Sequence, residues 1–285
     1  MSQYKNCILC GENKTKVFKK LNGFTIVQCI NDDFIYVNPQ PGEVEIKNFY
    51  TKEYFNSEKR FGYQNYLELE KSLKIDAKRL LKSIRPYGGD LLDIGCSFGF
   101  LLEVARELGF KVFGADISQD CINYCISKGF IVKWLSDYND NFFDIITLIG
   151  VIDHFSDPIK DFQEIKRVSK PGASIIIRIA NMDLFLGRHS TVKPPEHLYY
   201  FSSATLKRFL EDNGFQVTNI RRSLTPFTID EFSFRVFRYL FRISHYDFWF
   251  DIQKLISGIL KFLKMDKIVI LFPDGQIILN ARCKK

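Results

Sequence analysis

The segment at 91–105 constrains the fold of this chain more than any other. Residues 91–94 form the apolar run typical of a buried strand, and residues 100–105 favour a helix. Between them, Gly95 and Gly99 stand four positions apart in a short turn. The first glycine would let the backbone approach a ligand closely, and the second would let the helix pack tightly on the strand. The segment therefore predicts a site for a nucleotide-like ligand.

An acidic residue ends the next apolar run. Asp116 follows the expected strand at 111–115 and lies 21 residues after Gly95, where Rossmann-type folds place the carboxylate that binds ribose hydroxyls. The glycine spacing differs from GxGxxG and does not favour a dinucleotide. Asp93, at the end of the first strand, would repel a phosphate but suits an ammonium or sulfonium group. S-adenosylmethionine carries both of these groups.

These residues resemble the class I S-adenosylmethionine-dependent methyltransferases. The sequence DIGCSFG at 93–99 is similar to their first motif, and FGADIS at 113–118 is similar to their ribose-binding motif. The resemblance implies S-adenosylmethionine as the cofactor, with its amino group near Asp93 and its ribose on Asp116. The predicted cofactor-binding residues are Asp93, Gly95, Cys96, Gly99, Asp116, Ile117 and Gly150.

Strands and helices are expected to alternate through most of the chain. Expected strands lie at 91–94, 111–115, 130–134, 143–149, 174–180 and 215–220, and expected helices near 64–84, 99–108, 119–127, 158–168 and 203–213. Pro171 and Gly172 are expected to turn the chain into the strand at 174. This alternation predicts an α/β fold with a parallel sheet covered by helices on both faces. The family resemblance implies a Rossmann-like, seven-stranded sheet whose last strand, 276–281, is antiparallel.

Three parts are expected along the chain: a small module at 1–50, a cofactor-binding core at 64–223 plus 275–285, and an insertion at 224–274. The insertion is rich in aromatic residues and carries a helical apolar stripe at 252–263. The stripe favours a helical cap packed on the core. A lid over the acceptor, or a peripheral contact with lipid head groups, is the alternative.

The first module contains a CxxC knuckle, Cys7 and Cys10, with Cys29 further along. It resembles the zinc-ribbon-like N-terminal segment of some of these methyltransferases, in which a fourth cysteine stands where this chain has Asp32. Two interpretations follow. Either Cys7, Cys10, Cys29 and Asp32 bind zinc, with Asp32 as an oxygen ligand, or the site has decayed and the module folds by packing alone.

Candidate catalytic residues follow the strands whose carboxyl ends should face the ligand. Asp153 and His154 come after the strand at 143–149, and His197 lies in a loop at 194–202 that resembles a loop near the acceptor in the family. A histidine is the natural general base near neutral pH. We expect His154 as the first candidate base and His197 as the second, with Asp153 orienting an imidazole. The alternative is that both histidines only hold loops in place.

The predicted function is methyl transfer from S-adenosylmethionine to a small molecule. The resemblance implies a hydroxyl acceptor on a sugar or glycan precursor, or on a quinol-type phenol. Alternatives are an rRNA methyltransferase and a cofactor-binding protein without activity.

The net charge of +7 falls mainly in 221–285, which suits an anionic partner or a solvated face, but no basic-aromatic RNA motif is present. An odd number of cysteines, seven, favours a reduced, cytoplasmic protein, and no apolar run is long enough to span a membrane.

Overall fold

The computed structural model of the 285-residue chain describes residues 3–42, 45–46, 66–82, 84, 88–183, 192–228 and 269–285. The chain divides into two compact units, residues 1–221 with 275–285, and residues 222–274. Of the second unit, only the stretches at its two ends are described. The helix expected at 252–263 therefore lies outside the described residues.

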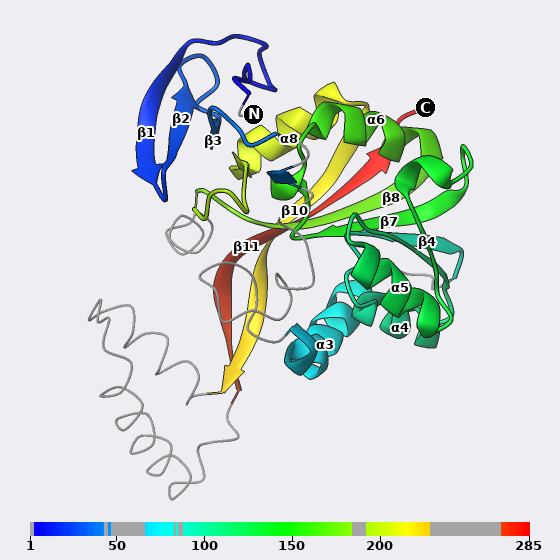
Figure 1. Ribbon diagram of the computed structural model, residues 1–285. Coiled ribbons are helices and arrows are strands. Elements are labelled where there is room, and N and C mark those ends of the chain that lie inside the picture. The colour runs from blue at the N-terminus through cyan, green and yellow to red at the C-terminus, as the bar shows by residue number, and fades with distance from the viewer. Residues whose placement is uncertain are drawn as a thin grey trace, which may run out of the picture. The chain divides into compact units, whose positions relative to one another are not determined.

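A seven-stranded sheet forms the centre of the first unit (Figure 1). Its order is β10-β11-β8-β7-β4-β5-β6. The strands are β4 (Asp90–Ile94), β5 (Lys111–Ala115), β6 (Ile131–Lys133), β7 (Phe143–Ile149), β8 (Ser169–Ala180), β10 (Phe215–Thr228) and β11 (Val269–Cys283). The strands β6, β5, β4, β7 and β8 run parallel to one another, whereas β11 pairs antiparallel with β8. The predicted Rossmann-like, mostly parallel sheet with an antiparallel last strand is confirmed.

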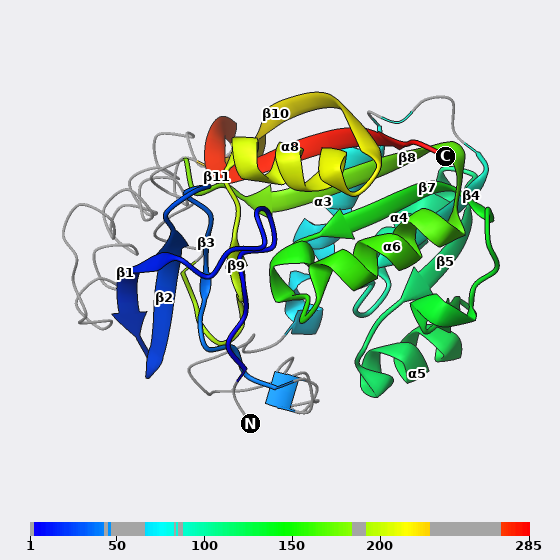
Figure 2. The same ribbon diagram turned by 90° about the horizontal axis from the view of Figure 1, so that it is seen from above.

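Helices cover both faces of this sheet (Figures 1 and 2). The helices α3 (Glu70–Leu81), α4 (Phe100–Glu107) and α5 (Gln119–Ser127) lie on one face, and α6 (Pro158–Val168) and α8 (Ser203–Asp212) on the other. Neighbouring residues of β4 point to opposite faces: Leu91 packs in the cluster that contains α3 and α4, and Leu92 packs in the cluster that contains α6 and α8. Because both faces are covered, Leu91 to Ile94 of β4 are all buried, including the carboxylate of Asp93. Among the residues that the structure describes, no helix is long and apolar enough to cross a membrane.

Local signals fix several helix starts. A single 3-10 turn, η1 (Tyr66–Leu69), leads into α3, and two others are η2 (Leu135–Asp137) and η3 (Ile152–His154). Asp157 caps α6 by accepting from the backbone N–H of Lys160. Ser202 and Thr205 form a reciprocal capping box at the start of α8.

A second sheet joins the N-terminal segment to a loop of the core. Its antiparallel strands run in the order β1-β2-β3-β9, with β1 (Thr15–Leu21), β2 (Phe24–Cys29), β3 (Ile35–Val37) and β9 (Tyr199–Tyr200). The first three come from the N-terminal segment, and β9 follows the loop after β8. Phe34 and Phe201, whose ring centroids are 5.0 Å apart, belong to the same buried cluster as α6 and α8. The N-terminal segment thus shares a core with the larger sheet, and a boundary at residue 50 stays a prediction.

Three strands are longer than the sequence suggests. The expected turn at Pro171 and Gly172 is wrong, because β8 already begins at Ser169. Gly172 keeps a positive φ of 76° inside the strand, and the pairing with β7 shifts register there. β10 and β11 also extend beyond the predicted 215–220 and 276–281.

Candidate functional site

The turn after β4 is built around backbone conformations that suit glycine. Gly95 and Gly99 have φ values of 71° and 76°. The N–H of Gly95 donates to the carbonyl of Ala115 at 2.7 Å, which joins the turn to the end of β5. A Cβ on Gly95 would clash with Val151, so this glycine admits the segment that follows β7. A Cβ on Gly99 would lie 3.0 Å from Cys125 Sγ of α5. Gly99 therefore makes room for α5, and the expectation that it packs the helix on the strand is wrong.

Asp116 holds this turn through both of its carboxylate oxygens. It accepts from the N–H of Ser97 at 2.9 Å and from the N–H of Ser118 at 2.8 Å. Burial raises the pKa of Asp116, and these backbone N–H groups oppose that shift. Each carboxylate oxygen keeps a second lone pair for a further donor, such as a ribose hydroxyl. The next residue, Ile117, is 47% exposed and offers an apolar surface beside the turn.

A pocket opens where β4, β7 and β8 end beside α3. Three of the predicted cofactor-binding residues line it, namely Asp93, Gly95 and Cys96. Gly99, Asp116, Ile117 and Gly150 are not among its lining residues. Sequence analysis missed three polar residues of the lining, which are Tyr66, Asp76 and Arg178.

Asp93 is the buried anion of this pocket, only 4% exposed. It accepts a 2.6 Å hydrogen bond from Thr147 Oγ1, on the neighbouring strand β7. Burial, with a smaller contribution from the charge of Asp116, raises the pKa of Asp93 to about 7 against the opposing effect of the hydrogen bond from Thr147. A buried carboxylate with this pKa is suited to pair with a cationic ligand group.

Arg178 supplies the opposite charge in the same pocket. Its guanidinium donates to Asp76 Oδ2 of α3 at 2.8 Å, and its side chain is 14% exposed. The methionyl end of S-adenosylmethionine carries an ammonium and a carboxylate. Asp93 and Arg178 therefore fit the two charged groups of that cofactor, each with one side chain of opposite sign.

A second polar cluster forms beyond β7, at the same edge of the sheet. His197 Nδ1 lies 3.2 Å from Asp153 Oδ2, while His154 Nε2 lies 3.9 Å from Asp153 Oδ1. The two imidazoles contact each other edge to face, with centroids 4.7 Å apart. The structure thus brings together all three predicted catalytic residues.

Both histidine side chains of this cluster are 17% exposed. Desolvation of the imidazole lowers the pKa of His154 to about 4, although the charge of Asp153 partly opposes the shift. His154 is therefore neutral at pH 7 and a weak base. Asp153 is 3% exposed, and its Oδ2 lies 3.2 Å from His197 Nδ1, although the two atoms do not form a hydrogen bond in this conformation.

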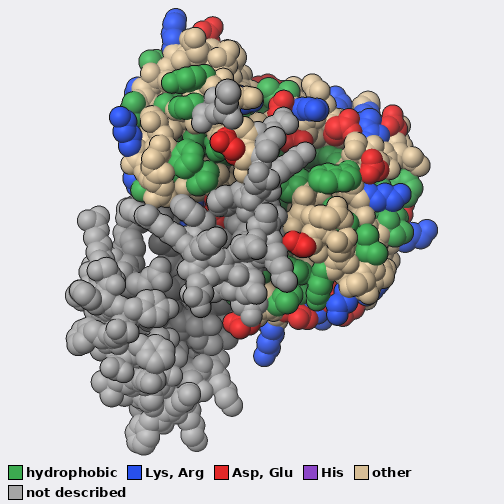
Figure 3. Space-filling view, viewed as in Figure 1, with side chains coloured by type: hydrophobic (Ala, Val, Ile, Leu, Met, Phe, Trp, Pro, Cys, Tyr) green, Lys and Arg blue, Asp and Glu red, His purple; other side chains and the backbone are tan. Residues whose placement is uncertain are grey.

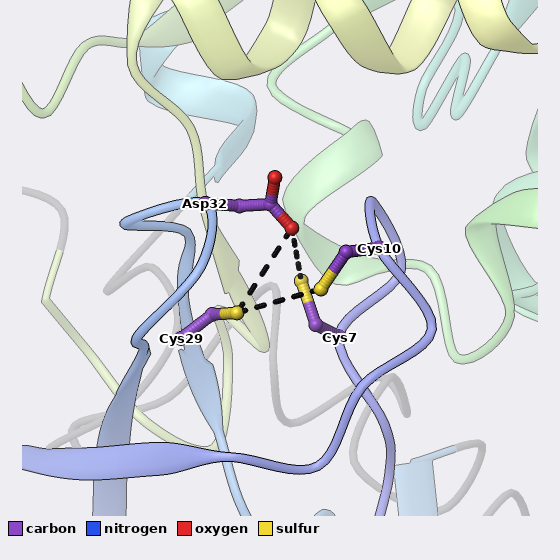
Figure 4. Close-up of side chains that lie close together, drawn as sticks. All are labelled: Cys7, Cys10, Cys29 and Asp32. Atoms are coloured by element: carbon purple, nitrogen blue, oxygen red, sulfur yellow. Dashed lines mark hydrogen bonds between the residues drawn. The ribbon is translucent and has the colours of Figure 1, made fainter.

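The four predicted metal ligands also lie together (Figure 4). Asp32 Oδ2 lies 3.6 Å from Cys7 Sγ and 3.9 Å from Cys29 Sγ, and Cys10 Sγ lies 3.6 Å from Cys29 Sγ. Burial raises the pKa of Cys7 to about 12, so this thiol is protonated in the metal-free protein. The other oxygen of Asp32, Oδ1, binds the guanidinium of Arg208 from α8.

Comparison with known proteins supports the same fold and family. The turn after β4, at Gly95 to Gly99, is called the donor turn below. The family described as "Methyltransferase domain" matches residues 63–220, more than half of the chain. A ubiquinone biosynthesis O-methyltransferase of Methylococcus capsulatus is 27% identical over 108 residues, which cover 34% of this chain and 46% of that protein. An uncharacterized protein of Methanocaldococcus jannaschii is 30% identical over 145 residues, which cover 48% of this chain and 68% of that protein.

A solved structure supports the fold assignment. The S-adenosylmethionine-dependent methyltransferase of Archaeoglobus fulgidus superposes with a TM-score of 0.50 at 24% identity, covering 76% of this chain and 98% of that one. The chain spans about half the length of the ubiquinone-pathway relatives it matches. The family match, the sheet order and the charged pocket after β4 lead to one assignment: this chain belongs to the methyltransferase domain family, as a class I member that uses S-adenosylmethionine.

Proposed function

We propose that this protein transfers the methyl group of S-adenosylmethionine to a hydroxyl of a small molecule, with a sugar or sugar-linked acceptor as the leading candidate. The observation that carries the proposal is the pairing of buried Asp153 with His197, 3.2 Å apart, at the sheet edge that also holds the donor pocket. A carboxylate and an imidazole in this arrangement form a general base for an O–H group.

The chain's own residues would bind and align the reactants. Asp93 would pair with the ammonium of the donor and Arg178 with its carboxylate, while Asp116 would accept from the ribose hydroxyls. S-adenosylmethionine, when bound, supplies an electrophilic methyl group on a sulfonium. Fixing donor and acceptor in line is the main contribution available to the protein, because the displacement itself needs little further chemistry.

His197 would remove the acceptor proton. Asp153 beside Nδ1 favours the tautomer with its proton on that nitrogen, which leaves Nε2 free to accept a proton. Nε2 of His197 would take the proton of the acceptor hydroxyl as its oxygen is methylated. This assignment prefers His197 to His154, because His154 has its pKa lowered to about 4.

An aliphatic hydroxyl gains most from such a base, because it is a far weaker acid than a phenol. This supports a sugar hydroxyl over a quinol phenol. The ubiquinone-pathway relatives are named O-methyltransferases, which supports oxygen as the acceptor atom and keeps a quinol as the rival substrate. Incubating the protein with methyl-labelled donor and matched panels of sugar nucleotides and catechols tests the choice. We expect the label on a sugar oxygen. Label only on catechols would show that the acceptor is a phenol and not a sugar.

Two other functions are less well supported. On the face shown in Figure 3, the described side chains of Lys and Arg are scattered among those of Asp and Glu, an arrangement that does not favour a nucleic acid acceptor there. A protein that only binds the cofactor would have no use for a buried carboxylate facing a histidine. Donor binding without turnover on any panel would nevertheless support the second of these functions.

A further inference from the structure

The cysteine cluster of the N-terminal segment has the dimensions of a metal site. In tetrahedral zinc sites, Zn–S bonds of about 2.3 Å and Zn–O bonds of about 2.1 Å place neighbouring ligand atoms about 3.5–3.8 Å apart. Three of the separations among the ligand atoms of Cys7, Cys10, Cys29 and Asp32 are 3.6, 3.6 and 3.9 Å, and all four atoms lie within 4.8 Å of one another. The four side chains therefore converge on one point from two separate loops (Figure 4).

The two loops hold their ligands with backbone hydrogen bonds. Gly11 donates its N–H to the carbonyl of Cys7 at 2.8 Å, which closes the knuckle around Cys10. Asp33 donates to the carbonyl of Cys29 at 3.1 Å, which closes the turn that presents Asp32. Asp33 itself has a positive φ of 54°. Each loop thus fixes its pair of ligands without help from a metal.

Arg208 explains how an aspartate can stand as the fourth ligand. Its guanidinium binds Asp32 Oδ1 and also donates to the carbonyl of Leu9, in the knuckle, at 3.3 Å. The side chain of Asp32 is only 5% exposed, so an unpaired charge there would be costly. With Oδ1 held by Arg208, Oδ2 alone faces the sulfur atoms and can act as a monodentate ligand. Arg208 also offsets one of the four negative charges of a three-thiolate, one-carboxylate set.

We propose that Cys7, Cys10, Cys29 and Asp32 bind one zinc ion, and that Arg208 of α8 is the positioning residue that holds Asp32 as an oxygen ligand. Three thiolates select zinc over the harder divalent cations. Because Arg208 belongs to α8 and the ligands belong to the N-terminal segment, the Asp32–Arg208 pair links the metal site to α8. The proposal does not depend on methyl transfer.

The test measures metal in the full-length protein. Protein purified under reducing conditions from zinc-supplemented cells should contain one zinc per chain by elemental analysis. Asp32→Asn should lose the zinc, and Arg208→Gln should bind it about 10–100-fold more weakly, as expected when a residue that orients a ligand is removed. The matched controls Asp33→Asn and Lys207→Gln remove a neighbouring charge without touching the cluster, and should keep wild-type affinity.

Cobalt substitution identifies the ligands even if Asp32→Asn fails to fold. The wild-type protein should show a thiolate-to-cobalt charge-transfer band of three-thiolate intensity, and Asp32→Cys should raise it to four-thiolate intensity while keeping the fold. A small fraction of one zinc per chain, or a Cys10–Cys29 disulfide in its place, would overturn the metal site. Unchanged zinc affinity in both Asp32→Asn and Arg208→Gln would overturn the roles of these two residues.

Discussion

His197 Nδ1 and Asp153 Oδ2 lie 3.2 Å apart, although one comes from the loop before β9 and the other from η3. The backbone holds the two segments together, because Leu198 donates its N–H to the carbonyl of Asp153 at 2.8 Å. The carbonyl of Leu198 in turn accepts from the N–H of Val37, the last residue of β3, which is the strand that pairs with β9. The N-terminal sheet therefore braces the loop that carries His197.

The first prediction concerns the base. Replacing His197 with Asn should lower kcat by about 10²-fold or more, because no general base then takes the proton of the acceptor hydroxyl. The Kd for S-adenosylmethionine should stay within about twofold, since His197 is not in the donor pocket. Single-turnover kinetics and calorimetry give the two quantities. His154→Asn is the matched comparison and should lower kcat less. A larger loss of kcat in that variant would show that His154, not His197, is the general base.

The second prediction is a pH dependence of donor binding. The carboxyl of Asp93 has a pKa of about 7 in the free protein, and it must be charged to pair with the donor's ammonium. Below pH 7, binding therefore releases a proton, and affinity should fall by up to about tenfold per pH unit. Above pH 7, the affinity should level off.

Calorimetry at pH 6 in two buffers of different ionisation enthalpy should detect this release of nearly one proton. Asp93→Asn should bind more weakly at pH 8, with the pH dependence removed, because the amide cannot titrate. Proton uptake on binding, or an Asn variant with the wild-type pH profile, would exclude Asp93 as the partner of the ammonium.

The third prediction separates the conformational cost of a side chain at positive φ from the steric cost of a side chain at Gly95. Gly95 and Gly129 both have positive φ, 71° and 76°, but only Gly95 has a neighbour, Val151, in the place of a Cβ. Gly129→Ala should lower the free energy of unfolding by about 1–2 kcal/mol, the cost of holding an alanine backbone in the left-handed region. Gly95→Ala should cost about 1–3 kcal/mol more because of overpacking.

Chemical denaturation measures both values, and a double variant isolates the steric part. Adding Val151→Ala to Gly95→Ala should recover much of the extra loss, since it removes the clashing methyl groups. Equal costs for Gly95→Ala and Gly129→Ala would mean that Val151 moves aside freely.

Local sequence signals predicted the donor turn and most of the sheet, because strand, glycine turn and acid are close in the chain. Contacts between distant segments carry no such signal. Tyr199 and Tyr200 are too short a run to be distinguished as a strand, and Arg178 stands within an apolar strand with no motif around it. The preference for His197 over His154 depends on the surroundings of the His154 imidazole, which lower its pKa to about 4 and which only the folded chain defines. The pairing of Asp32 with Arg208 joins residues 176 positions apart.

The last prediction tests the carboxylate partner of the donor. Arg178→Gln should raise the Kd for S-adenosylmethionine about 10–100-fold, the effect expected from losing one charge-assisted hydrogen bond. Arg282→Gln, which removes an exposed arginine that donates to the carbonyl of Gly172, is the control for a change of charge alone.

A donor lacking the carboxylate makes this test specific. The wild-type protein should bind decarboxylated S-adenosylmethionine about 10–100-fold more weakly than the intact donor, because Arg178 then has no ligand anion to pair with. Arg178→Gln should bind the two donors with similar affinity, since neither can use the missing guanidinium. If the variant still prefers the intact donor by the wild-type factor, another group holds the carboxylate, and Arg178 serves only to pair with Asp76.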